Sequence, residues 1–114
     1  MSMNEAYQLD VRLQPNETLA LIKEGMPQES ELLYEELNDL GEGKMIGTLV
    51  YERYYFRSGN QAALVILVDN LKGRSNVRLI PAGGSNGLIL KLDWGAGKSF
   101  ASSVERILSD YIVE

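Results

Sequence analysis

The chain has 114 residues, of which 45% are hydrophobic and 24% charged, and a formal net charge of −5. This length and balance are typical of one soluble globular domain spanning residues 1–114, with no room for a second. The chain contains no His and no Cys, which excludes a histidine base, a thiolate nucleophile, disulfides and thiolate zinc sites.

The charge is unevenly distributed along the chain. Residues 1–42 carry ten acidic and two basic side chains, whereas residues 43–114 carry six acidic and nine basic ones. The overall negative charge repels a phosphate backbone, so we expect no nucleic-acid partner. The first five residues lack the basic and apolar regions of a secretory signal, and no apolar run reaches the roughly 20 residues of a membrane span. We therefore expect a cytoplasmic protein without a membrane partner.

The first two predicted elements are a strand and a short helix. Residues 6–13 alternate apolar and polar side chains, with Gln8 and Asp10 on the polar face, which predicts a strand. Pro15 then suits the first turn of a helix of about ten residues, which Gly25 ends.

The segment of residues 29–39 is ambiguous. Its Leu, Glu and Tyr residues favour a helix by propensity, but Leu33 and Leu37 among exposed acids also fit a strand. We favour the strand, followed by a hairpin loop at residues 38–43, whose Asn, Asp and Gly residues suit a turn.

The remaining elements are four strands and a helix. The strands are predicted over residues 45–56, 61–68, 77–80 and 88–92, and the near-continuous apolarity of the second indicates a central strand covered on both faces. Apolar residues with helical spacing predict a helix over about residues 98–113.

The predicted order β-α-β-β-β-β-β-α indicates an α+β fold in two layers, with an antiparallel sheet of about six strands and two helices on one face. It is similar to a small helix-grip or TATA-binding-protein-like sheet, and such an analogy of fold does not transmit function. The predicted core consists of Leu64, Ile66, Val68, Val77, Leu79, Leu88, Leu90 and Leu92, packed under Phe100, Val104, Ile107, Leu108 and Tyr111.

One group of candidate ligand-binding residues lies on the predicted sheet. Tyr51, Arg53 and Tyr55 share a strand face, and Arg78 and Lys91 join them if their strands pair suitably. Such a surface can take a small acidic or planar ligand through bidentate guanidinium contacts and stacking. Cross-strand packing explains the same residues without a ligand.

A second candidate is the loop of residues 83–87, in which Gly83, Gly84 and Ser85 can present backbone N–H groups to an anion. The alternative is a simple turn, although a type I′ turn needs only two residues with positive φ.

Two further motifs fail on spacing. Gly97-Lys98-Ser99 resembles the end of a phosphate-binding loop, but Leu92 stands where that motif requires its first glycine. The acids of residues 29–42 lack the spacing of a calcium-binding loop, so no metal is predicted.

The second sheet face suggests the function. This face is too apolar to be exposed to water, because it carries Ala63, Val65, Leu67 and Ile89. We expect a non-catalytic module, without a cofactor, that binds a small acidic ligand or a protein partner through the sheet surface and the loop of residues 83–87. A homodimer in which this face packs against its twin is the first alternative. An enzyme is the second, since no candidate side chain titrates near neutral pH unless strongly perturbed.

Several short motifs resemble a known family. They are Val50-Tyr51-Glu52-Arg53-Tyr54, Gly59-Asn60 before an apolar strand, Ala82-Gly83-Gly84-Ser85, and Trp94-Gly95. Over about residues 45–100 the chain resembles the bacterial family called domain of unknown function 6054. The resemblance implies a bacterial cytosolic protein and implies no activity.

Overall fold

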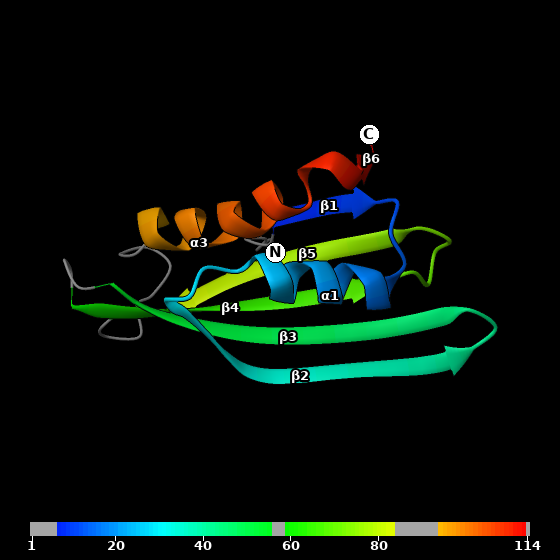
Figure 1. The fold of residues 1–114 in the computed structure, drawn as a ribbon, viewed down its shortest axis with the longest axis horizontal. Helices are drawn as coiled ribbons and strands as arrows, with labels where there is room; N and C mark the ends of the chain where they lie inside the picture. Colours follow the sequence, from blue (N-terminus) through cyan, green and yellow to red (C-terminus); the bar gives the residue numbers. More distant parts are fainter. Residues whose placement is uncertain (1–6, 56–58, 84–93, 114) are drawn as a thin grey trace, which may run out of the picture.

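The computed structural model describes residues 7–55, 59–83 and 94–113 (Figure 1). The elements in chain order are β1 (Tyr7–Val11), α1 (Pro15–Gly25), β2 (Ser30–Gly41), β3 (Lys44–Tyr55), β4 (Asn60–Asp69), β5 (Ser75–Gly83), α3 (Trp94–Ile107), the 3-10 turn η1 (Ser109–Tyr111) and β6 (Ile112–Val113). The strands form a 6-stranded antiparallel sheet in the order β2-β3-β4-β5-β1-β6. The predicted α+β fold, with a six-stranded antiparallel sheet and two helices, is confirmed.

Both helices that the structure describes lie on the same side of the sheet, which we call the helix face (Figure 1). Helix α1 contacts β3, β4 and α3, and α3 contacts β4 and β5. The approach of α1 is close, because a Cβ atom added at Gly47 of β3 would lie 2.5 Å from Cδ1 of Leu19. Glycine at this position therefore allows α1 to pack against the backbone of β3.

The core lies between the helices and the sheet. The predicted core residues Leu64, Ile66, Val68, Val77, Leu79, Phe100, Val104 and Leu108 are all buried, and Ile107 and Tyr111 are partly buried against them. Leu49 and Ile22 add to this layer. The predicted core positions Leu88, Leu90 and Leu92, and the strand expected there, lie outside the described residues.

The ambiguous segment forms strand β2, as we favoured, but the predicted hairpin loop is too long. Asn38 and Asp39 still pair with β3, and Gly41 pairs with Lys44. Only Glu42 and Gly43 therefore form the turn, and their φ angles of 56° and 82° match the positive values that a type I′ turn requires.

The last helix is shorter than the predicted one, which extended to about residue 113. Helix α3 ends at Ile107, and the chain turns through η1 so that Ile112 pairs with Val11. The backbone N–H of Arg12 donates to the carbonyl of Tyr111 at 2.9 Å. This pairing with β1 competes with helix propagation, because β-branched residues such as Ile112 pack well in a strand.

The opposite side of the sheet is the open face, since both described helices lie on the helix face. Cross-strand partners share a face, so the register assigns side chains to it. The open face carries Gln8, Asp10, Glu31, Tyr34, Glu36, Thr48, Val50, Glu52, Ala63, Val65, Leu67, Asp69, Asn76, Arg78 and Ile80.

Candidate functional site

The candidate residue Tyr51 belongs to the core. Its side chain lies on the helix face and is only 3% exposed. Burial raises the pKa of the phenol, and the carboxylate of Glu35 on the neighbouring strand raises the pKa further. A ligand could meet this side chain only by displacing the helices that cover it.

The candidate residue Arg53 forms contacts inside the fold. Its Nε and Nη2 atoms donate to Oγ of Ser30 at 3.1 and 2.9 Å. Its Cζ atom lies 4.6 Å from the centroid of the Phe100 ring, within the range of a cation–π interaction. Arg53 therefore connects β3 with the start of β2 and with α3.

The candidate residue Arg78 lies on the other side of the sheet. It is opposite Leu67 of β4, whereas Tyr51 is opposite Leu64 and Arg53 opposite Ala62. Because adjacent residues of a strand point to opposite faces, Arg78 does not share a surface with Tyr51 and Arg53.

The other candidate residues lie at or beyond the limits of the described structure. Tyr55 and Gly83 are the last residues of β3 and β5. Gly84, Ser85 and Lys91 lie outside the described residues, and ligand binding at the loop of residues 83–87 stays a prediction.

Arg78 lines a hollow at one end of the open face, which we call the Arg78 hollow. Its volume is about 910 Å³, and it is lined by Gln8, Asp10, Asp69, Leu71, Lys72, Gly73, Arg74, Asn76 and Arg78. Three of these side chains are cationic and two are carboxylates. The hollow therefore combines charges of both signs, with one more cation than carboxylate.

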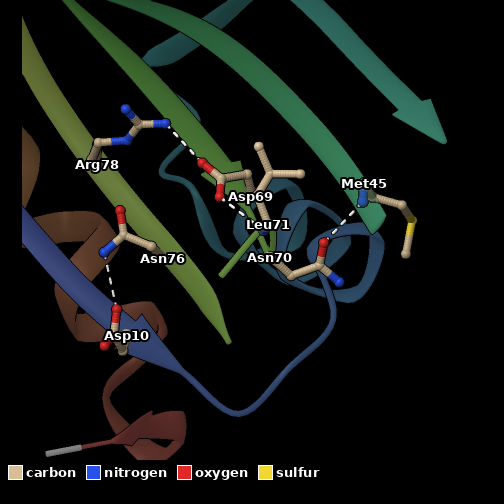
Figure 2. A network of polar contacts seen from close by, with 7 residues as sticks. All are labelled: Asp10, Met45, Asp69, Asn70, Leu71, Asn76 and Arg78. Atoms are coloured by element: carbon tan, nitrogen blue, oxygen red, sulfur yellow. Dashed lines mark hydrogen bonds and ion pairs between the residues drawn. The ribbon is translucent and has the colours of Figure 1, made fainter. Parts of the chain in front are cut away.

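Figure 2 shows how the polar side chains of the hollow are held. Nη2 of Arg78 donates to Oδ2 of Asp69 at 2.9 Å, and Nδ2 of Asn76 donates to Oδ1 of Asp10 at 2.9 Å. Arg74 forms a looser ion pair with Asp10 at 3.6 Å. Nε of Arg78 is buried and has no hydrogen-bond acceptor among the described residues. The guanidinium of Arg78 thus has donor capacity that Asp69 does not use.

The turn beside the hollow is attached to the neighbouring hairpin by Asn70 (Figure 2). Its Oδ1 accepts from the backbone N–H of Met45 at 2.9 Å, and its Nδ2 donates to the carbonyl of Gly43 at 2.8 Å. Oδ1 of Asp69 accepts from the backbone N–H of Leu71 at 3.1 Å. These bonds hold the β4–β5 turn in place, and with it the position of Lys72.

A family model described as "Family of unknown function (DUF6054)" matches residues 3–112. The chain belongs to this family. The resemblance seen over about residues 45–100 is confirmed and extends through the N-terminal third. No curated protein and no solved structure matches the chain.

The centre of the open face of this DUF6054 protein is apolar. Tyr34, Val50, Val65 and Ile80 are successive cross-strand neighbours from β2 to β5, and we call them the central row. The three aliphatic side chains are half-buried, and Tyr34 is exposed. Glu36 raises the pKa of the Tyr34 phenol, because its carboxylate accepts a hydrogen bond from that phenol and carries a negative charge.

The end of the open face opposite the Arg78 hollow is acidic. Glu31 of β2 is directly opposite Glu52 of β3, and neither forms an ion pair with a described Lys or Arg. Like charges in directly opposed positions are destabilising. In this DUF6054 protein the open face thus has an acidic end, an apolar centre and an end where cations are in excess.

The described residues include no group of three or more Asp and Glu placed to hold a metal ion. Among the helices that the structure describes, none has the length and apolar character needed to cross a membrane.

Proposed function

We propose that the protein is a non-catalytic module that binds a protein partner on the open face of its sheet. The observation that carries this proposal is the central row, in which Val50, Val65 and Ile80 lie on a face that neither described helix covers. Sheet faces with aliphatic side chains are normally packed against a second layer. A partner with an apolar stripe would supply that layer and remove these side chains from water.

The charges at the two ends of the open face would orient the partner. Lys72, Arg74 and Arg78 favour an acidic group over the Arg78 hollow, and Glu31 and Glu52 favour a basic group at the other end. Such complementary charges select the partner and its direction more than they add affinity. A small acidic ligand would use the same cations of the hollow.

A second copy of the chain is the other candidate for this partner. The Arg78 hollow and the Glu31–Glu52 pair lie at opposite ends of the strands. Because the hollow lies on β4, β5 and β1 and the glutamates lie on β2 and β3, the required twofold axis runs parallel to the sheet, between the two copies, and oblique to the strands. Such an axis would place the hollow of one copy over the glutamates of the other. The contact would then be reciprocal, as in other symmetric dimers.

Light scattering on the wild-type chain and the Val65→Lys variant tests the second copy. A lysine at this central position would place an unpaired charge in the contact, so a dimer should become a monomer. Ala20→Lys on the exposed side of α1 is the control, and it should leave the mass unchanged. Circular dichroism of both variants checks that they are folded.

If the wild-type chain is a monomer, a photo-crosslinking residue at position 65 tests for a different partner in cells. We expect an adduct that is absent when the same residue replaces Ala20, and the identified protein must bind the purified chain and not Val65→Lys. A monomer with identical crosslinks from both positions would refute the proposal.

A further inference from the structure

Strand β2 forms one edge of the sheet, and its outer side pairs with no other described strand (Figure 1). Such an edge presents a row of unpaired backbone N–H and C=O groups, to which another extended chain can add. Proteins commonly shield an edge by making the strand short, but β2 has 12 residues, about twice the usual length of a strand. The backbone of β2 therefore offers a long template for strand addition.

The side chains of β2 expose apolar surface along this edge. Leu33, Tyr34, Leu37 and Leu40 are 51%, 51%, 45% and 56% exposed. They are four of the six large hydrophobic side chains that are exposed among the described residues. Solvent-facing leucines are unfavourable on an edge that only has to stay unpaired. Their concentration on one strand indicates a contact surface.

The negative charge of β2 and its flanking residues indicates the charge of the partner. Residues 29–42 contain six acidic and no basic side chains. Glu35 forms an ion pair with Lys23 of α1, and Oδ1 of Asp39 accepts from the backbone N–H of Gly41 at 2.9 Å. The other four acids form no ion pair with a described residue. A second copy on this edge would place acids opposite acids, which is repulsive.

We propose that the outer edge of β2 binds an extended basic segment of a partner protein, which adds to the sheet as a further strand. Its Lys or Arg side chains would neutralise the glutamates, and its aliphatic side chains would cover Leu33, Leu37 and Leu40. The main-chain hydrogen bonds of β-augmentation supply affinity, and the alternating side chains supply selectivity. Tyr34 and Glu31 belong to both surfaces, but Leu37 lies opposite Gly47 on the helix face and Val65 lies on the open face. Leu37→Ser and Val65→Lys therefore test the two proposals separately, and either proposal can fail without the other.

A synthetic peptide of about ten residues that alternates Lys and Val is the probe. Fluorescence anisotropy with the full chain should show binding that weakens as salt is raised. Hydrogen exchange should slow at β2 amides and not at β5 amides. A peptide that alternates Glu and Val should not bind. Methylating alternate backbone nitrogens of the basic peptide should weaken binding by about tenfold or more, because the methyl groups block strand pairing.

Matched variants locate the contact on β2. Leu37→Ser should weaken binding severalfold, whereas Leu71→Ser in the β4–β5 turn should not, although both leucines are 45% exposed. Replacing Glu29 and Glu31 by Gln should weaken binding and flatten its salt dependence. Circular dichroism of each variant checks the fold.

Three results would overturn the proposal. The first is equal binding of the parent and N-methylated peptides, and the second is an equal effect of Leu37→Ser and Leu71→Ser. The third is a wild-type dimer that Leu37→Ser dissociates, because it would assign this edge to a second copy of the chain.

Discussion

The packing of α1 on β3 leads to a quantitative prediction for Gly47→Ala. The added methyl carbon would lie 2.5 Å from Cδ1 and 3.1 Å from Cγ of Leu19, whereas carbon atoms pack best at about 3.5–4.0 Å. Leu19 is 3% exposed, so it cannot move into solvent. Such overpacking destabilises the fold by about 1–3 kcal/mol. Replacing a strand glycine by alanine also stabilises the fold by about 0.5–1 kcal/mol, because alanine loses less conformational entropy on folding. The free energy of unfolding should therefore fall by about 0–2.5 kcal/mol, with a central value of about 1 kcal/mol.

Urea unfolding of the wild-type chain and the Gly47→Ala variant measures this loss, provided that both transitions have the same m value. Gly25→Ala is the control. A methyl group at Gly25 would lie 2.9 Å from Cγ1 of Ile107, which is only half-buried and can adjust. Better helix propensity also offsets that contact. We expect Gly25→Ala to change stability by less than about 0.5 kcal/mol.

A double-mutant cycle tests the cause of the loss. Leu19→Ala alone should cost about 2–4 kcal/mol, because it leaves a cavity in the core. In that background there is room for the new methyl group, so Gly47→Ala should be neutral or stabilising. The same loss in both backgrounds would refute the assignment to Leu19.

Three further predictions concern side chains of β3. The raised pKa of Tyr51 means that the unfolded chain loses this phenolic proton first as the pH passes the ordinary value of 10.0. The free energy of unfolding should therefore be unaffected by Tyr51 below about pH 9 and should fall above about pH 10. Tyr51→Phe should flatten that fall in urea titrations at alkaline pH, and superimposable curves would contradict the burial argument. Glu52→Gln removes the like-charge contact with Glu31, so it should raise stability by about 0.2–1 kcal/mol at low salt. The gain should shrink at high salt, and a loss would show that Glu52 has a favourable contact. Arg53→Met removes the bonds to Ser30 and the contact with Phe100, so it should cost about 1–3 kcal/mol. In a Ser30→Ala background the cost should be smaller, and strict additivity would argue against the hydrogen bonds.

Local patterns were sufficient to predict most elements. Alternation identified β1 and β3, a near-continuous apolar run identified β4, and Pro15 and Gly25 marked the ends of α1. Strand β2 was harder, because its acids and leucines fit both a helix and a strand. Its pairing with β3 decided the outcome, and that contact has no local signature.

The candidate site was predictable only in part. Which face each side chain shares with its neighbours, and the order of the strands, depend on contacts between residues far apart in the sequence. Strand β4, which lies between Arg53 of β3 and Arg78 of β5, is apolar on both faces. Its sequence therefore does not show whether the two arginines share a face. The Arg78 hollow depends on the pairing of β1 with β5, which brings Asp10 to Asn76 across 66 positions of sequence. Alternation did place Gln8 and Asp10 on the polar face of their strand. It could not predict that Lys72 and Arg74 of a distant turn would join them.

Asn70 has a consequence for the alignment of the sheet. Alternating hydrophobicity penalises a slip of one residue between two strands, because that slip exchanges the faces, but it tolerates a slip of two. Asn70 bonds to Gly43 and to Met45 just beyond the last pair of the β3–β4 ladder. A slip of two residues would break both side-chain bonds. The amide of Asn70 therefore favours one alignment among those that keep the same side chains on each face of the sheet. It also maintains the spacing of the charged groups across the sheet.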